Sequence, residues 1–252
     1  MKIISITNQK GGVGKTATVA AIGAGLCRSG RRVLYIDLDP QRNFSLQLGA
    51  IRAGATIYDL LTGTARTTDA IQDTPHGAII AADARLSEKG ILTHPGDLQR
   101  LKSILTQIQA RFDVCLIDTP PTLGVLTVSA LIAADGIIIP CKADRFSLDA
   151  LHEIAGTVDA IRATANSGLT VYGVLITQYN GRTTANRLML DELKAEAARQ
   201  HMSVYAPPIR RSIAVEETQI TGGTVYDSRN NAAADYAEIV KALLKQLKEG
   251  KQ

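Results

Sequence analysis

Glycines and lysines near the N-terminus are spaced as in a loop that binds phosphate. The run Gln9-Lys10-Gly11-Gly12-Val13-Gly14-Lys15-Thr16 follows a short apolar stretch and precedes a helical pattern. Glycines let the backbone wrap closely around an anion, and the N-terminus of the following helix adds its dipole. Lys15 can reach the β- and γ-phosphates, while the Thr16 hydroxyl can hold Mg²⁺. The predicted nucleotide contacts here are Lys10, Gly11, Gly12, Val13, Gly14, Lys15, Thr16 and Ala17.

The beginning of this loop departs from the usual phosphate-loop pattern GxxxxGK[ST]. Gln9 stands where the first glycine is expected, and Lys10 adds a second positive charge. From its position, Lys10 can act on the γ-phosphate of its own site or reach the phosphates of a partner subunit. The spacing leaves both alternatives open.

Carboxylates follow two apolar runs farther along the chain. Asp37 and Asp39 end the run 33–36, and alternate residues of an extended strand point to the same side. Such a pair beside a phosphate loop suits Mg²⁺ coordination through water and the positioning of an attacking water. Asp118 ends the run 113–117, which is a Walker B pattern. We therefore expect Thr16 and Asp118 on the metal side, with Asp37 and Asp39 close to them.

The motifs KGGVGKT, DLDPQ and DTPP resemble those of the ParA/MinD group of deviant Walker A ATPases, and DPQ with DTPP favours the small ParA type. The resemblance implies that Lys10 completes the active site of the opposite subunit in a face-to-face dimer. It also implies that Asp39 orients the hydrolytic water and that Asp37 acts on the Mg²⁺ side with Thr16 and Asp118. Lys15 is then the other catalytic cation. ParA boxes usually continue with Gly-Asn, whereas Arg42-Asn43 follows here.

The same resemblance implies a function. ATP and Mg²⁺ are the expected cofactors of a slow ATPase that yields ADP and phosphate. ATP binding is expected to join two subunits into a homodimer that binds nonspecific DNA, and a ParB-like centromere-binding protein is expected to stimulate hydrolysis and release. Such a protein would be cytoplasmic and associated with the nucleoid when ATP-bound.

Two further surfaces are expected from the second half of the chain. In the family it resembles, loops equivalent to those with Gln178 and Pro207 border the adenine. The segment 182–211 contains six basic and three acidic residues, a surplus that a solvated helix surface would also show. The resemblance implies contacts to DNA phosphates. The candidates are Arg182, Arg187, Arg210 and Arg211.

Two other classes remain open. A Min-like membrane-cycling regulator needs an amphipathic C-terminal helix, and apolar residues from Tyr236 to Leu247 recur at helical spacing with lysines between them. The same stripe is typical of a helix that closes a core. A metabolic or redox relative, either a dethiobiotin-synthetase-like ligase or a nitrogenase-iron-protein-like reductase, is the third class. Cys27, Cys115 and Cys141 are widely spaced and include no CxxC pair, which disfavours the redox version.

Short apolar runs alternate with helical patterns along the chain, and this predicts a mostly parallel, twisted β-sheet with helices on both faces. The expected strands are Lys2–Thr7, Arg32–Asp37, Ala78–Ala82, Asp113–Asp118, Gly136–Pro140 and Thr170–Thr177. The expected helices are Thr16–Ser29, Asp97–Ala110, Leu123–Ala133, Ser147–Ala163, Thr184–His201 and Asn231–Lys248.

Composition bounds the organisation of the molecule. The chain has 252 residues, with 28 basic and 24 acidic residues, so its formal charge is only +4. We expect one ATPase domain over residues 1–252, without an N-terminal helix-turn-helix domain and with a closing helix at about 231–248. Apolar runs fall short of the ~20 residues of a membrane span, and no membrane partner is expected. Residues 52–94 give the weakest pattern.

Overall fold

The computed structural model describes residues 1–51, 54–88, 91–92 and 94–249. Within these ranges, seven strands form one sheet in the order β3-β4-β2-β5-β1-β6-β7. Neighbouring strands are parallel except for β3 and β4, which form an antiparallel pair at one edge. The expected mostly parallel sheet is confirmed. The strands are β1 (Lys2–Ile6), β2 (Val33–Asp37), β3 (Ile71–Thr74), β4 (Gly77–Ile80), β5 (Val114–Asp118), β6 (Gly136–Lys142) and β7 (Thr170–Thr177).

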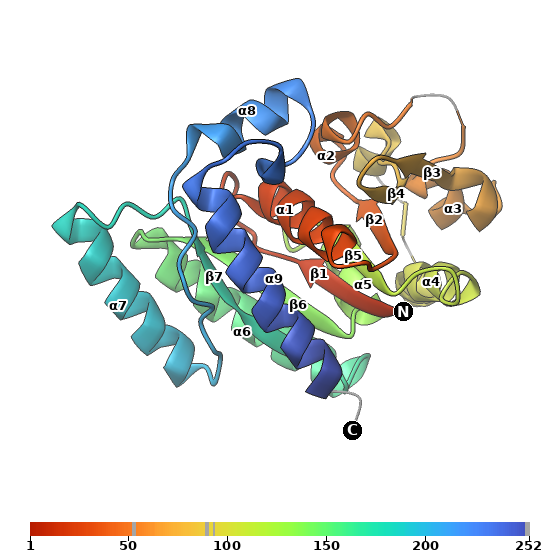
Figure 1. The fold of residues 1–252 in the computed structure, drawn as a ribbon. Coiled ribbons are helices and arrows are strands. Elements are labelled where there is room, and N and C mark those ends of the chain that lie inside the picture. The colour runs from red at the N-terminus through yellow and green to blue at the C-terminus, as the bar shows by residue number, and fades with distance from the viewer. Residues whose placement is uncertain (52–53, 89–90, 93, 250–252) are drawn as a thin grey trace.

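Helices cover both faces of the sheet (Figure 1). Alternate residues of the strands point to opposite faces, and on each face they pack with the helices in separate apolar cores. Ile4 and Ile6 of β1 join the core beneath α1 (Lys15–Arg28), α2 (Asn43–Gln47) and α9 (Asn231–Glu249). On the opposite face, Ile117 of β5 and Ile139 of β6 contribute to cores under another set of helices. These are α3 (Ile57–Thr62), α4 (Arg100–Gln107), α5 (Val125–Ala133), α6 (Phe146–Thr164) and α7 (Thr184–Arg199).

Two glycines allow α1 to lie very close to its neighbours. A Cβ atom on Gly23 would lie 2.1 Å from Cε1 of Tyr35 on β2. On Gly25 it would lie 2.7 Å from Cγ2 of Val240 on α9. The small residues of α1 therefore bring the first and last helices together, directly behind the phosphate loop. In this face α9 buries Tyr236, Ile239, Val240 and Leu243.

The two edges of the sheet are finished differently. At one edge, β3 is only four residues long and pairs antiparallel with β4. At the other edge, the segment 203–209 runs along β7. Tyr205 N donates to Val174 O at 2.9 Å, and Ile209 N donates to Ile176 O at 2.8 Å. Some of the backbone N–H and C=O groups on the outer side of β7 are therefore already hydrogen-bonded to this segment.

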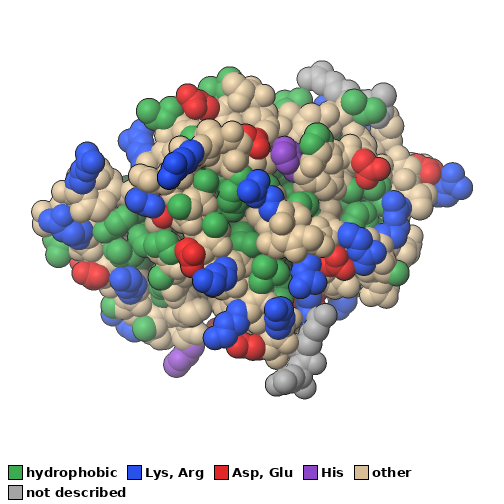
Figure 2. Space-filling model, viewed as in Figure 1, with side chains coloured by type: hydrophobic (Ala, Val, Ile, Leu, Met, Phe, Trp, Pro, Cys, Tyr) green, Lys and Arg blue, Asp and Glu red, His purple; other side chains and the backbone are tan. Residues whose placement is uncertain are grey.

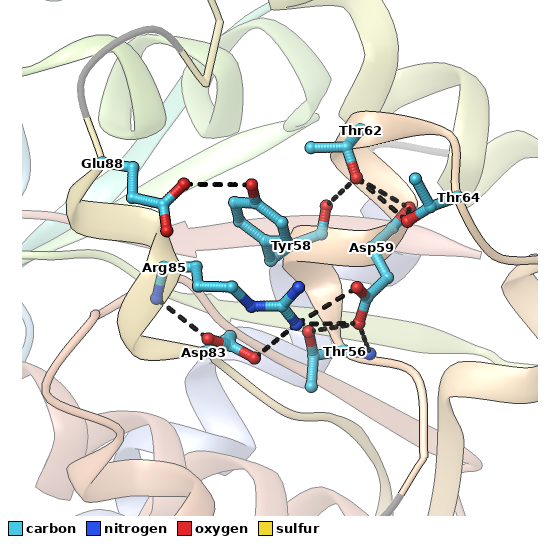
Figure 3. Close-up of polar contacts among 8 residues, drawn as sticks. All are labelled: Thr56, Tyr58, Asp59, Thr62, Thr64, Asp83, Arg85 and Glu88. Carbon is cyan, nitrogen blue, oxygen red and sulfur yellow. Dashed lines mark hydrogen bonds and ion pairs between the residues drawn. The ribbon is translucent and has the colours of Figure 1, made fainter.

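A polar cluster connects α3 to the short 3₁₀ helix η2 (Ala84–Ser87), as Figure 3 shows. The Arg85 guanidinium lies 4.2 Å from the centre of the Tyr58 ring and pairs with Asp59 at 3.1 Å and Asp83 at 2.7 Å. The Tyr58 hydroxyl donates to Glu88 at 3.1 Å. These contacts order a part of the chain where the sequence pattern is weakest.

Several elements differ from the sequence expectation. The hairpin strand β3, the helices α2 and α3, and helix α8 (Ile213–Thr221) are not expected, and the predicted helix from Asp97 begins instead as the 3₁₀ turn η3 (Pro95–Gln99). α8 buries none of its residues, so it has no apolar stripe to reveal it. The remaining short turns are η1 (Thr67–Ala70) and η4 (Val225–Asp227). Residues 52–53, 89–90 and 93 of the weak segment lie outside the described ranges. Among the described helices, none is long and apolar enough to cross a bilayer.

Candidate nucleotide site

The glycine-rich loop connects the carboxyl end of β1 to the first turn of α1. Gly12 and Gly14 have φ values of 69° and 85°, a left-handed conformation that glycine adopts without a Cβ clash. Val13 between them is fully buried, and its carbonyl accepts a hydrogen bond of 2.8 Å from the Thr177 hydroxyl at the end of β7. The loop is thereby fixed over the carboxyl edge of the sheet, where open α/β sheets bind ligands.

A cavity of about 530 Å³ opens beside this loop. Its walls come from the loop, from the turn after β2 with α2, from the turn after β5, and from α8. The lining residues are Gly11, Gly12, Gly14, Lys15, Thr16, Asp39, Gln41, Asn43, Leu46, Gln47, Pro121 and Gln219. Sequence reasoning missed the contributions of α2 and α8, which no motif marks.

Thr16 lines this cavity and contacts Asp118, the last residue of β5. The Thr16 hydroxyl donates to Oδ2 of Asp118 at 2.8 Å. The other oxygen, Oδ1, is buried and has no hydrogen-bond partner among the described residues. A buried acceptor without a donor is costly unless a cation or water completes it. One hydroxyl and a carboxylate oxygen beside a phosphate loop fit the hard oxygen ligands that Mg²⁺ prefers.

Asp37 lies beside Asp118, because the two residues share one register position on the paired strands β2 and β5. Burial, together with the nearby Asp39 carboxylate, raises the pKa of Asp37 to about 6, although hydrogen bonds from Ser45 and from the Asp39 N–H oppose this shift. Burial and the Asp37 charge also raise the pKa of Asp118. Two crowded carboxylates of this kind favour a bound cation.

The carboxylate of Asp37 also builds the turn that carries Asp39. Its Oδ1 accepts the Asp39 N–H at 3.0 Å, and its Oδ2 accepts both the N–H and the hydroxyl of Ser45 at 2.9 and 2.6 Å. The Ser45 hydroxyl in turn accepts the N–H of Ala82 at 3.0 Å. Asp39 itself is half-buried and lines the cavity.

The two lysines of the loop lie differently. Lys15 lines the cavity and donates to the carbonyl of Lys10 at 3.1 Å. Burial lowers its pKa, and the charges of Asp118 and Asp39 partly oppose this shift. Lys10 instead turns to the loop after β6, where its Nζ contacts both oxygens of Asp144 at 2.8 and 2.7 Å. Phe146, whose ring centre is 5.1 Å from that Nζ, is 72% exposed.

A smaller cavity adjoins the first and contains part of the expected base site. It is lined by Ala17 and Gln178, together with Val215, Glu216 and Gln219 of α8. Gln178 donates to the carbonyl of Gly12 at 2.9 Å, so it also supports the phosphate loop. Pro207 lies outside the residues that line either cavity.

The four candidate arginines are not equivalent, and three of them line a neighbouring groove. Arg210 is fixed by Asp235, which accepts its Nη2–H at 2.6 Å and its backbone N–H at 3.0 Å. Asp235 is 4% exposed, whereas Arg211 is 72% exposed and only 3.7 Å from Glu216. Arg182 and Arg187 are exposed at the start of α7, a region where basic side chains gather at the left of Figure 2. The groove contains Arg182, Arg210 and Arg211.

Fold and site together define a P-loop nucleotide-binding protein whose loop carries an additional lysine. A family described as an AAA domain (AAA_31) matches residues 1–171. The sporulation initiation inhibitor protein Soj of Bacillus subtilis is 35% identical over 248 residues, which are 95% of this chain and 97% of Soj. The chromosome partitioning protein ParA of Caulobacter vibrioides is 36% identical over 258 residues, covering 97% and 94% of the two chains. The chain therefore belongs to the ParA family of deviant Walker A ATPases.

A solved structure supports the same assignment of the site. The cobyrinic acid a,c-diamide synthase of Mycobacterium smegmatis, crystallised with ADP and magnesium, superimposes with a TM-score of 0.87 at 33% identity. The match covers 99% of this chain and 96% of that one. That protein thus holds a nucleotide and Mg²⁺ on the fold that this chain shares.

Proposed function

We propose that this protein is a DNA partition ATPase that binds ATP with Mg²⁺ and hydrolyses it to ADP and phosphate. The observation that carries the proposal is the Thr16–Asp118 pair next to a glycine-rich loop. Oδ1 of Asp118 is buried and has no hydrogen-bond partner among the described residues. The family membership and the Mg²⁺ and nucleotide in the Mycobacterium structure support the same ligands.

Each residue of the site then has a defined task. Backbone N–H groups of residues 11–16 and the Lys15 ammonium bind the phosphates. Thr16 and Asp118 hold Mg²⁺, which neutralises charge on the transferred phosphoryl group, and Asp37 acts from the metal side through its charge. Asp39, on the turn that Asp37 fixes, orients the attacking water.

Lys10 completes the site of a second subunit. It does not line the cavity of its own subunit, and its ammonium lies on Asp144 beside the exposed Phe146. A face-to-face homodimer with ATP between the subunits gives this lysine a phosphate to contact. Light scattering with ATP and with ADP measures the dimer directly.

The ATP-bound dimer is proposed to bind DNA through phosphates and without sequence preference, at the exposed arginines near α7 and the adjoining groove. A ParB-like partner would stimulate hydrolysis and release the DNA, so the protein would occur on the nucleoid in its ATP form and elsewhere in the cytoplasm otherwise. The Min-like alternative receives less support, since the apolar face of α9 is buried against α1.

The proposal is tested by co-sedimentation of the protein with DNA and, in parallel, with anionic liposomes, each with ATP, ADP or no nucleotide. ATP-dependent DNA binding that weakens steeply with added salt is the expected result. Lys15→Ala is the matched control, because it should abolish nucleotide binding and DNA binding together. Binding to liposomes and not to DNA would instead favour the membrane-cycling function.

A further inference from the structure

Lys142, the last residue of β6, extends to the phosphate loop beside Gly12. Its Nζ lies 3.8 Å from the position that a Cβ atom on Gly12 would occupy. Gly12 lines the cavity, whereas Lys142 does not. The ladder between β6 and β7, in which Lys142 pairs with Thr177, fixes the backbone from which the side chain extends.

The Lys142 ammonium has no ion-pair partner among the described residues, because the nearby charges are engaged elsewhere. Lys10 is paired with Asp144, and Lys15 is buried with Asp118 and Asp39 nearby. No carboxylate among the described residues lies within 4.0 Å of Lys142 Nζ. The nearest acid in the sequence, Asp144, is held by Lys10 and by the N–H and hydroxyl of Ser147. A half-buried ammonium with no counter-ion is expected to serve an anion that arrives from outside.

We propose that Lys142 is a third cation of the phosphate site, acting on the phosphate oxygens of a bound nucleotide around Gly12. The inference rests on the proposed nucleotide binding. It concerns the phosphates of the same subunit or, in the face-to-face dimer, those of the partner. Because Lys142 does not line the cavity, its contribution is mainly Coulombic, so it depends on ionic strength and on the number of phosphate charges.

Neutral and charge-retaining variants test this directly. Lys142→Met keeps most of the side-chain packing and removes the charge, while Lys142→Arg retains a cation. Affinity for fluorescent ATP and ADP analogues is measured at low and high salt. We expect about three- to tenfold weaker ATP binding for Lys142→Met at low salt, near-normal binding for Lys142→Arg, and a smaller difference near 0.5 M salt. Lys245→Gln, at a side chain that is 78% exposed on α9, is the control for loss of a remote positive charge.

A Lys10→Ala background separates the two sources of phosphate. If Lys142 acts within its own subunit, Lys142→Met weakens ADP binding even in this background. If it acts on the partner, ADP binding is unchanged in this background, and Lys142→Met in the otherwise wild-type protein weakens ATP-driven dimerisation instead. A wild-type protein that binds no nucleotide overturns the proposed function itself. The role of Lys142 alone is overturned if the wild type binds nucleotide and the Lys142→Met variant binds ATP and ADP and dimerises as the wild type does at low salt.

Discussion

Arg42, in the turn after Asp39, has a backbone conformation that favours glycine and a long side chain that is partly buried. Its φ is 61°, a left-handed value, and its N–H donates to the Asp39 carbonyl at 2.9 Å. Its Nε is buried without a hydrogen-bond partner among the described residues. The family pattern has glycine at this position, so the backbone keeps the glycine-type conformation although the side chain has changed.

We therefore expect Arg42→Gly to be more stable than Arg42→Ala by about 1 kcal/mol, since alanine keeps the Cβ that crowds a left-handed backbone. Urea unfolding of the two variants without nucleotide measures the difference. Equal free energies of unfolding would show that the turn relaxes when the arginine is removed.

Lys10 gives a second prediction at this scale. Lys10→Ala should keep the affinity for ADP within about twofold, because Lys10 lies outside the cavity, but should lose ATP-driven dimerisation and at least about tenfold in turnover. Fluorescence titration and light scattering distinguish these effects. A Lys10→Ala protein that dimerises with ATP like the wild type would rule out an interaction across the subunits.

Helix α1 illustrates packing between elements, and its glycines can be tested against a matched position. Gly25→Ala should destabilise the fold by about 1–2 kcal/mol, because overpacking against Val240 outweighs the better helix propensity of alanine. Gly156→Ala on α6, where an added Cβ meets nothing within 4 Å, should stabilise it by about 0.5–1 kcal/mol. Thermal unfolding of both variants gives the comparison. Stabilisation by both substitutions would mean that α1 and α9 lie farther apart than described.

The start of β2 is joined to the start of β5 by Asp113. Its carboxylate accepts the Arg32 N–H at 2.9 Å and Nη2–H at 2.9 Å, and hydrogen bonds from Arg32 lower the pKa of Asp113 to about 2. A carboxyl with a lowered pKa in the folded state stabilises the fold above its unfolded pKa of about 4, and this stabilisation is lost as pH falls toward 2.

Asp113→Asn should therefore cost about 1 kcal/mol at pH 7, and the difference from the wild type should shrink between about pH 4 and pH 2. Denaturant unfolding at a series of pH values measures it. A difference that stays constant down to pH 2 would assign the loss to the backbone hydrogen bond rather than to the charge.

Much of this element-scale arrangement is predictable from the sequence. The runs ending in Asp37 and Asp118 predicted buried parallel strands, because uninterrupted apolar residues fit a sheet covered on both faces. Lys15 and Thr16 line one cavity, and the Thr16 hydroxyl donates to Asp118 at the end of β5. α8 and the partner of Lys10 were not predictable: α8 buries no apolar face, and the ion pair with Asp144 joins residues 134 positions apart.

At the scale of the whole molecule, the neighbouring arginines Arg210 and Arg211 are expected to have different roles. Arg210 is expected to stabilise the fold, and Arg211 to contribute to DNA binding. Arg210→Ala should lower the free energy of unfolding by about 2 kcal/mol, because it leaves the buried Asp235 carboxylate without its main donor. Arg211→Ala should leave stability within about 0.5 kcal/mol. If Arg211 neutralises one DNA phosphate, its removal should make the plot of log affinity against log salt concentration shallower by about one unit of slope.

Gel-shift titrations at several salt concentrations, paired with urea unfolding, test the two substitutions together. Arg182→Ala and Arg187→Ala extend the series to α7. If Arg211→Ala and the α7 variants retain the wild-type slope, the DNA surface lies elsewhere on the molecule.

Both edges of the sheet have few free backbone hydrogen-bonding groups among the described residues, and this limits how copies of this chain can assemble. A short antiparallel strand ends the sheet at β3, and the segment 203–209 occupies backbone groups of β7. Within the part of the chain that the structure describes, neither edge offers a long row of open N–H and C=O groups to another strand. Assembly by strand addition, the route to fibrous aggregates, is therefore disfavoured at high concentration. The dimer proposed above would instead use side-chain surfaces around the nucleotide cavity, where a bound ligand could control it.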